Sequence, residues 1–255
     1  MNKSDTAHAP RAPQETSWSS VPDTMPVDAI FPVRVMAGPD RAVPDDHGYA
    51  LFSAMSRVLG DWIHGDRDIA IHPLRGQHTR PGWLQPMALV CRLPRARVEV
   101  LRPLVGKELE IVPRTERTTR VLRVESGPHL HELAPARALR AEINFSHATE
   151  NDTLARVRVG ERLREMGIEA PFELGASRRI RIGHGGARII EVTVYDLAPE
   201  DALVLQALGM GGRRRFGCGV FVPVDAGRRM TPATPSPADA ARALRLALRG
   251  EVRDG

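Results

Sequence analysis

Glycine and arginine are concentrated between residues 209 and 223, in the sequence Gly-Met-Gly-Gly-Arg-Arg-Arg-Phe-Gly-Cys-Gly-Val-Phe-Val-Pro. Glycine lets a backbone approach a ligand closely, and guanidinium groups suit phosphate oxygens. This segment follows a predicted helix and precedes a predicted strand, the reverse of the order in a P-loop or a dinucleotide fingerprint. A helix cap followed by a strand entry would explain some of the glycines but not the arginines. We therefore predict an anion-binding loop that uses Gly209, Gly211, Gly212, Arg213, Arg214, Arg215, Gly217 and Gly219.

A second arginine cluster lies in residues 177–188, on a predicted β-hairpin. Alternation along the strand places Arg179 and Arg181 on one face and the neighbouring isoleucines on the other. Together with Arg178, these arginines either form a solvated surface or follow an RNA backbone.

His47 is the histidine whose position most favours chemistry. It lies where a loop rich in proline and aspartate meets a helix predicted over residues 47–59. The positive end of a helix dipole favours the neutral imidazole, which can act as a base near neutral pH. The same position suits a histidine that only caps the helix, and position alone leaves both roles open. His64 and His72 flank a predicted strand, where histidines are usually structural.

Composition favours a polyanionic partner. The 255 residues carry a net charge of +5, and apart from Lys3 and Lys107 the basic residues are all arginine. A GC-rich genome would produce the same bias, although arginine is also the better residue for bidentate phosphate contacts. Aromatic residues make up only 4% of the chain, without the paired strand aromatics of an RRM. RNA binding would therefore depend on arginine, backbone and helix ends.

Metal, cofactor and membrane signals are weak throughout the chain. Cys91 and Cys218 lie far apart and lack a metal-ligand spacing, and no zinc-protease motif is present. We expect no metal and no cofactor. The N-terminal residues include no apolar signal region, and no run of about 18 apolar residues occurs. The expected protein has reduced thiols, no membrane segment and a cytoplasmic location.

Hydrophobic periodicity predicts the order β-α-β-β-α-β twice. The first repeat has strands at 30–36, 69–72, 83–93 and 108–112 and helices at 47–59 and 94–104. The second has strands at 138–145, 178–182, 188–197 and 219–224 and helices at 151–166 and 199–208. Tandem ferredoxin-like (βαββαβ) domains in an α+β fold are the simplest interpretation. The predicted divisions are a disordered leader (1–27), an N-terminal domain (28–112), a connector with a hairpin (113–136), a C-terminal domain with the glycine-rich loop (137–225), and a tail with a possible short helix (226–255).

Two motifs resemble a known group of proteins. Residues 209–223 are similar to the C-terminal glycine-rich loop of the RAMP superfamily. Residues 46–57, Asp-His-Gly-Tyr-Ala-Leu-Phe-Ser-Ala-Met-Ser-Arg, and 71–76, Ile-His-Pro-Leu-Arg-Gly, resemble the CRISPR repeat-processing endoribonucleases of myxobacterial type. The similarity covers about residues 28–225. It implies a metal-independent nuclease that cuts precursor CRISPR RNA within the repeat by attack of a ribose 2′-OH and leaves a 2′,3′-cyclic phosphate. Such proteins often retain the crRNA and join the interference complex.

The resemblance also implies residue roles. His47 matches the general acid/base, and Tyr49 would help to orient the scissile phosphate. No lysine matches the one that some relatives carry near the active site, which leaves Arg57 to supply positive charge. A non-catalytic RAMP subunit that grips crRNA is the alternative, and a ribosome- or tRNA-associated basic protein is a third. His47 distinguishes the first two, because a pure binding subunit needs no imidazole at that helix start.

Overall fold

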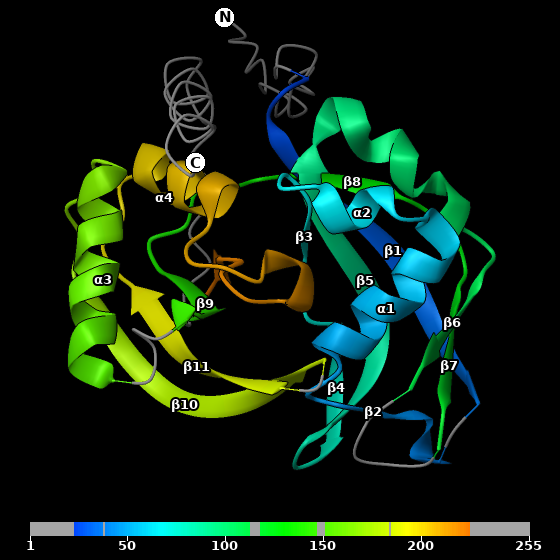
Figure 1. The fold of residues 1–255 in the computed structure, drawn as a ribbon. Coiled ribbons are helices and arrows are strands. Elements are labelled where there is room, and N and C mark those ends of the chain that lie inside the picture. The colour runs from blue at the N-terminus through cyan, green and yellow to red at the C-terminus, as the bar shows by residue number, and fades with distance from the viewer. Residues whose placement is uncertain (1–22, 38, 113–117, 147–150, 184, 225–255) are drawn as a thin grey trace, which may run out of the picture.

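The computed structural model describes residues 23–37, 39–112, 118–146, 151–183 and 185–224. Residues 1–22 of the predicted leader and the whole predicted tail, with its short helix, lie outside the described residues. Two antiparallel sheets form two lobes that stand side by side (Figure 1). No helix in the described part of the chain is long and apolar enough to span a bilayer.

The N-terminal sheet is built around β1 (Pro26–Ala37) and β5 (Trp83–Pro94), which pair along seven residues. The residues of β1 that point into the core are Val27, Ala29, Phe31, Val33 and Val35, in the strict alternation that a half-buried strand requires. The free edge of β5 pairs with three short strands, β2 (Val43–Pro44), β3 (Ala70–Ile71) and β4 (Arg75–Arg80). The helices of this lobe are α1 (Gly48–Leu59), α2 (Trp62–Gly65) and the 3₁₀ helix η2 (Arg95–Leu104).

The other edge of β1 is covered by strands from the predicted connector. Both β7 (Arg120–Val124) and β8 (His129–Glu132) pair with β1, and β6 (Glu108–Ile111) pairs with β7. An uncovered strand edge exposes unpaired backbone N–H and C=O groups. Pairing with β7 and β8 satisfies these groups along the edge of β1. Residues within 113–136 therefore contribute to the first sheet.

The C-terminal sheet has the order β10-β11-β9-β12. Its strands are β9 (Leu139–Ile143), β10 (Phe172–Ile182), β11 (Gly185–Val194) and β12 (Val222–Pro223), and its helices are α3 (Asp152–Glu165) and α4 (Pro199–Leu208). In chain order β9 is the first strand of its βαββαβ repeat, β10 the second, β11 the third and β12 the fourth. The spatial order of the strands is therefore 2-3-1-4. The N-terminal sheet repeats it through β4, β5, β1 and β7. The predicted tandem ferredoxin-like α+β fold is confirmed.

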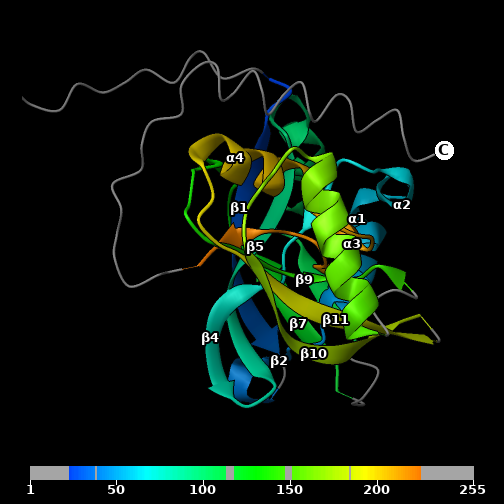
Figure 2. The same cartoon turned by 90° about the vertical axis from the view of Figure 1, so that its left-hand side faces the viewer.

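Three elements of the first repeat differ from their predictions. The strand predicted last, residues 108–112, forms β6, which pairs with β7 and not with β1, so β7 from the predicted connector takes the position beside β1. The second helix of the first repeat is 3₁₀ in form and contains Pro103, which cannot donate an α-helical hydrogen bond. Strand β4 was not predicted, because its six residues are all exposed and have no apolar alternation. Figure 2 shows β4 and its turn into β5 projecting from the body of the sheet.

Candidate active site

His47 directly precedes α1 and is buried, with 3% of its surface exposed. The backbone N–H of Leu74 donates to His47 Nε2 at 2.9 Å, and His47 Nδ1 lies 2.7 Å from the carbonyl oxygen of Pro44. Because an amide nitrogen only donates, Nε2 must accept and Nδ1 must carry the hydrogen. The side chain makes no capping bond to α1. Burial lowers the pKa of His47, against the opposing effects of the Pro44 bond and of Asp45, so the ring is neutral.

A small cavity adjoins His47 where the two domains meet. It is lined from the N-terminal domain by residues 45–48 and Pro73, and from the C-terminal domain by Glu142, Arg178, Ile180 and Ile189, with Phe216 and Cys218 of the glycine-rich loop. Arg178 donates to both carboxylate oxygens of Glu142, at 2.7 and 2.6 Å. Burial opposes the charge of Arg178, but the Glu142 carboxylate raises its pKa overall. A guanidinium is thus held at the wall of the cavity beside a neutral imidazole.

The β10–β11 hairpin reaches across from the C-terminal lobe to the start of α1 (Figure 1). The backbone N–H of Arg181 donates to Asp46 Oδ2 at 3.0 Å, and a Cβ placed on Gly183 would lie 3.9 Å from the Tyr49 hydroxyl. Ile180 is buried, whereas Arg179 and Arg181 are exposed. The predicted alternation of the hairpin is confirmed by this burial pattern.

The glycine-rich loop packs its backbone closely against the protein. A Cβ on Gly219 would lie 2.1 Å from the carbonyl oxygen of Met210, and one on Gly48 would lie 2.2 Å from that of Phe216. Several loop amides, among them those of Met210, Gly212 and Gly219 at 2.7 to 3.1 Å, donate to backbone carbonyls. Glycine is required here for contact between chain segments, and these amides are already used within the protein.

The three loop arginines each have a partner in the protein. Arg213 Nε donates to Asn144 Oδ1 at 3.1 Å, and its side chain stays exposed. Arg214 Nη2 donates at 3.3 Å to the carbonyl oxygen of Ala207, at the end of α4. Burial lowers the pKa of Arg214 to about 10, with a further contribution from nearby Arg92. Arg215 donates to the carbonyl oxygens of Ile63 and His64 and lies over the Phe52 ring, with Cζ 5.5 Å from the ring centroid.

The remaining predicted residues divide between two places. Tyr49 lies beside the cavity wall, with its ring 5.6 Å from that of Phe216. Arg57 lies ten residues after His47 along α1, which corresponds to about 15 Å of helix, and donates to the carbonyl oxygen of Glu110 at 2.8 Å. The structure therefore brings Tyr49 to the site of His47 but not Arg57.

Sequence reasoning missed several groups at this site. Asp46, Glu142 and Cys218 line the cavity, and burial raises the pKa of the Cys218 thiol to about 12. The motif at residues 71–76 was a usable signal, because it supplies the Leu74 N–H that binds His47. Within the described ranges, no group of three or more His, Cys, Asp or Glu side chains is arranged to hold a metal ion.

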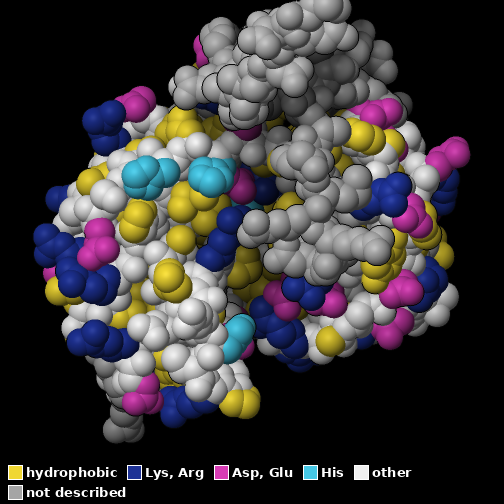
Figure 3. Space-filling view, turned by 180° about the vertical axis from the view of Figure 1, so that it is seen from behind, with side chains coloured by type: hydrophobic (Ala, Val, Ile, Leu, Met, Phe, Trp, Pro, Cys, Tyr) yellow, Lys and Arg dark blue, Asp and Glu magenta, His cyan; other side chains and the backbone are white. Residues whose placement is uncertain are grey.

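Basic side chains elsewhere are interspersed with acidic ones. Figure 3 shows the face opposite to that of Figure 1, where arginines lie among acidic side chains over both lobes. Ion pairs such as Arg34 with Glu125, at 2.9 Å, also join opposite charges at the surface. The net positive charge therefore does not form one continuous basic patch on the visible part of that face.

Comparison with known proteins places the chain in a family. Residues 27–226 match the family profile described as Cas6 Crispr. Over 204 residues the chain is 38% identical to the CRISPR-associated endonuclease Cas6 of Myxococcus xanthus (strain DK1622), covering 77% of this chain and 81% of that protein. Among solved structures, a CRISPR associated protein Cas6 matches with a TM-score of 0.52 at 13% identity, covering 78% of this chain and 100% of that one, which supports the fold. The product of a Cas6-related gene from Pyrococcus furiosus matches with a TM-score of 0.48 at 12% identity, covering 79% and 99%. The chain belongs to the Cas6 family of CRISPR-associated proteins.

Proposed function

We propose that this chain is a metal-independent endoribonuclease that cuts precursor CRISPR RNA within the repeat, leaves a 2′,3′-cyclic phosphate and retains the crRNA. Membership of the Cas6 family supports the substrate. The observation that carries the proposal is the neutral His47 imidazole at an interdomain cavity, between the arginine hairpin and the glycine-rich loop. Retention of the product would let the protein join an interference complex in the cytoplasm.

The reaction needs one proton removed from the ribose 2′-OH and one delivered to the 5′ leaving oxygen. His47 Nε2 is the basic nitrogen of the tautomer that its two partners require, and it takes the first proton once the 2′-OH replaces the Leu74 N–H as its partner. The resulting imidazolium then donates to the leaving oxygen. Because the nucleophile is already attached next to the phosphate, positioning replaces the need for a metal-activated water.

Positive charge at the phosphate would come from Arg178 in place of Arg57. Arg178 lines the cavity, whereas Arg57 is about 15 Å away along α1. Tyr49, beside the cavity wall, orients the phosphate in this proposal. Arg179 and Arg181 extend the basic surface along the hairpin, and exposed Arg213 extends it onto the loop.

The second candidate is a crRNA-binding subunit that does not cut. It is favoured by one observation, that both ring nitrogens of His47 have hydrogen-bond partners within the protein. In that case the imidazole would only join the loop before α1 to residues 72–74.

Single-turnover cleavage of repeat RNA separates the two candidates. His47→Ala should lower the rate by roughly 10²- to 10⁴-fold while RNA affinity changes by no more than a few-fold, because the imidazole transfers protons without anchoring the RNA. His64→Ala, which alters an exposed histidine on α2, is the matched control. Wild-type cleavage should persist in EDTA and stop when the nucleotide 5′ of the cut is 2′-deoxy. Inhibition by the chelator would refute the mechanism, and tight binding of the cognate repeat without cleavage would support the second candidate.

A further inference from the structure

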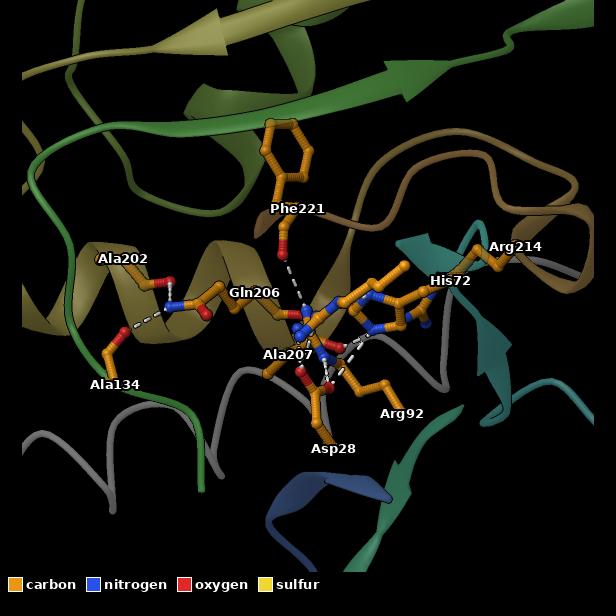
Figure 4. A network of polar contacts seen from close by, with 10 residues as sticks. Asp28, His72, Arg92, Ala134, Ala202, Gln206, Ala207, Arg214 and Phe221 are labelled. Carbon is orange, nitrogen blue, oxygen red and sulfur yellow. Dashed lines mark hydrogen bonds and ion pairs between the residues drawn. The ribbon is translucent and has the colours of Figure 1, made fainter. Parts of the chain in front are cut away.

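A buried polar network joins the two domains through Arg92 (Figure 4). Arg92, only 1% exposed, donates to both carboxylate oxygens of Asp28, at 2.7 and 3.1 Å. Its Nη1 also donates to the carbonyl oxygens of Gln206 and Phe221, at 2.9 and 3.0 Å. One guanidinium thus connects a strand of the first sheet to two segments of the C-terminal domain.

His72 is part of this network, and its tautomer follows from its partners. Arg75 Nη2 lies 3.2 Å from His72 Nδ1, and His72 Nε2 lies 3.3 Å from Asp28 Oδ1. A guanidinium only donates, so Nδ1 accepts and Nε2 carries the hydrogen that faces Asp28. Burial lowers the pKa of His72 to about 4, which keeps the ring neutral near pH 7.

Only Pro73 separates His72 from Leu74, whose amide binds His47. The backbone N–H of His72 donates to the carbonyl oxygen of Val90 at 2.9 Å, so the segment is anchored to β5 at this end. Pro73 packs closely on the glycine-rich loop, since a Cβ on Gly217 would lie 3.1 Å from Pro73 Cγ. Leu74 is buried and donates to His47 Nε2 at 2.9 Å.

We propose that His72 is a positioning residue for RNA cleavage. Its contact with Asp28, 3.3 Å from Nε2 to Oδ1, holds residues 72–74 so that the Leu74 N–H selects the Nδ1–H tautomer of His47 and leaves Nε2 as the proton-accepting nitrogen. Arg92 connects Asp28, which faces His72, to the carbonyl oxygens of Gln206 and Phe221. The packing of the C-terminal domain therefore helps to fix the position of residues 72–74. The inference rests on the proposed function of His47.

Two polar variants test the role of the Asp28 contact. In His72→Gln the amide nitrogen can take the place of Nε2 and donate to Asp28, whereas in His72→Asn the shorter amide reaches only the position of Nδ1. We expect His72→Asn to lower the single-turnover rate roughly 10- to 100-fold, because small displacements of a catalytic group are costly. It should also shift the acid limb of the pH-rate profile, while RNA affinity changes by no more than a few-fold. His72→Gln should recover most of the rate.

Each outcome supports or overturns the inference. A folded His72→Asn protein with the wild-type rate and pH profile would overturn it, as would a His72→Gln protein as impaired as His72→Asn. If His72→Asn does not fold, ¹⁵N NMR of the histidine rings in the wild type decides, because finding hydrogen on Nε2 of His47 would contradict the mechanism of positioning. An unaffected His47→Ala protein would refute the proposed function itself. An impaired His47→Ala beside an unaffected His72→Asn would refute only the role of His72.

Discussion

Mild acid should destabilise this protein before most carboxylates titrate, because two buried histidines are neutral in the folded state. Burial holds the pKa of His72 at about 4, against 6.5 for an ordinary histidine, and also lowers the pKa of His47. The unfolded chain therefore binds more protons between these values, and the free energy of unfolding falls as the pH falls from 6.5 towards 4. A difference of about 2.5 in pKa makes the contribution of His72 about 3 kcal/mol, fully present above pH 6.5.

Urea unfolding followed by tryptophan fluorescence between pH 7 and pH 4.5 would measure this loss. A His72→Gln protein cannot take up the proton, so its stability should decline less over the same range, with His47 still contributing. His64→Gln, at an exposed position, is the control and should follow the wild type. Asp28 acts at lower pH, because bonds from His72 and Arg92 outweigh burial and hold its pKa below 3.8, so its contribution is lost only below that value. Equal declines for the wild type and His72→Gln would refute the reasoning.

Three further predictions concern the close packing, the RNA surface and the thiols. Gly48→Ala should lower the melting temperature, with a loss on the order of 2 kcal/mol, because the added Cβ would lie 2.2 Å from the Phe216 carbonyl oxygen. Gly65→Ala should leave the melting temperature unchanged, because nothing lies within 4 Å of the added Cβ. Equal melting temperatures for the two variants would contradict the packing argument. Arg181→Ala should reduce the slope of log affinity for repeat RNA against log salt by about one, whereas Arg102→Ala, far from the hairpin in sequence and paired with Glu99, should leave it unchanged. Native Cys218 should resist a thiol reagent at pH 8 until the protein unfolds, and rapid labelling of the native protein would show that this thiol is not buried.

The architecture could be predicted because local patterns and packing agree. The apolar alternation of β1, and the caps and apolar spacing of helices such as α3, are visible in short windows of sequence. Asn151, for example, accepts hydrogen bonds from the amides of Thr153 and Leu154 at the start of α3. Strand β4 could not be found in this way, because it is a strand only through pairing with the edge of β5.

The candidate site was predictable in position but not in its contacts. The glycines and His47 marked the two segments that meet at the cavity. The directions of the arginines depend on backbone carbonyls far away in sequence, such as Ala207 for Arg214 and Ile63 for Arg215. A carbonyl group is present at every residue, so its use as an acceptor leaves no signal in the side-chain pattern. The motif at residues 71–76 marked the segment that binds His47, but which of its amides donates could not be identified for the same reason.

The duplicated topology suggests two halves that could be separated, but Arg92 argues otherwise. Removing the C-terminal domain would take away the Gln206 and Phe221 carbonyl oxygens and leave part of a buried guanidinium without acceptors. Removing the N-terminal domain would take away Arg92 and Asp28 together and leave the same two carbonyl oxygens without their donor, and an unsatisfied buried polar group typically costs about 1–3 kcal/mol. The two repeats should therefore unfold in a single transition and resist dissection into independently stable fragments. In this protein the unit of cooperative stability is the pair of domains.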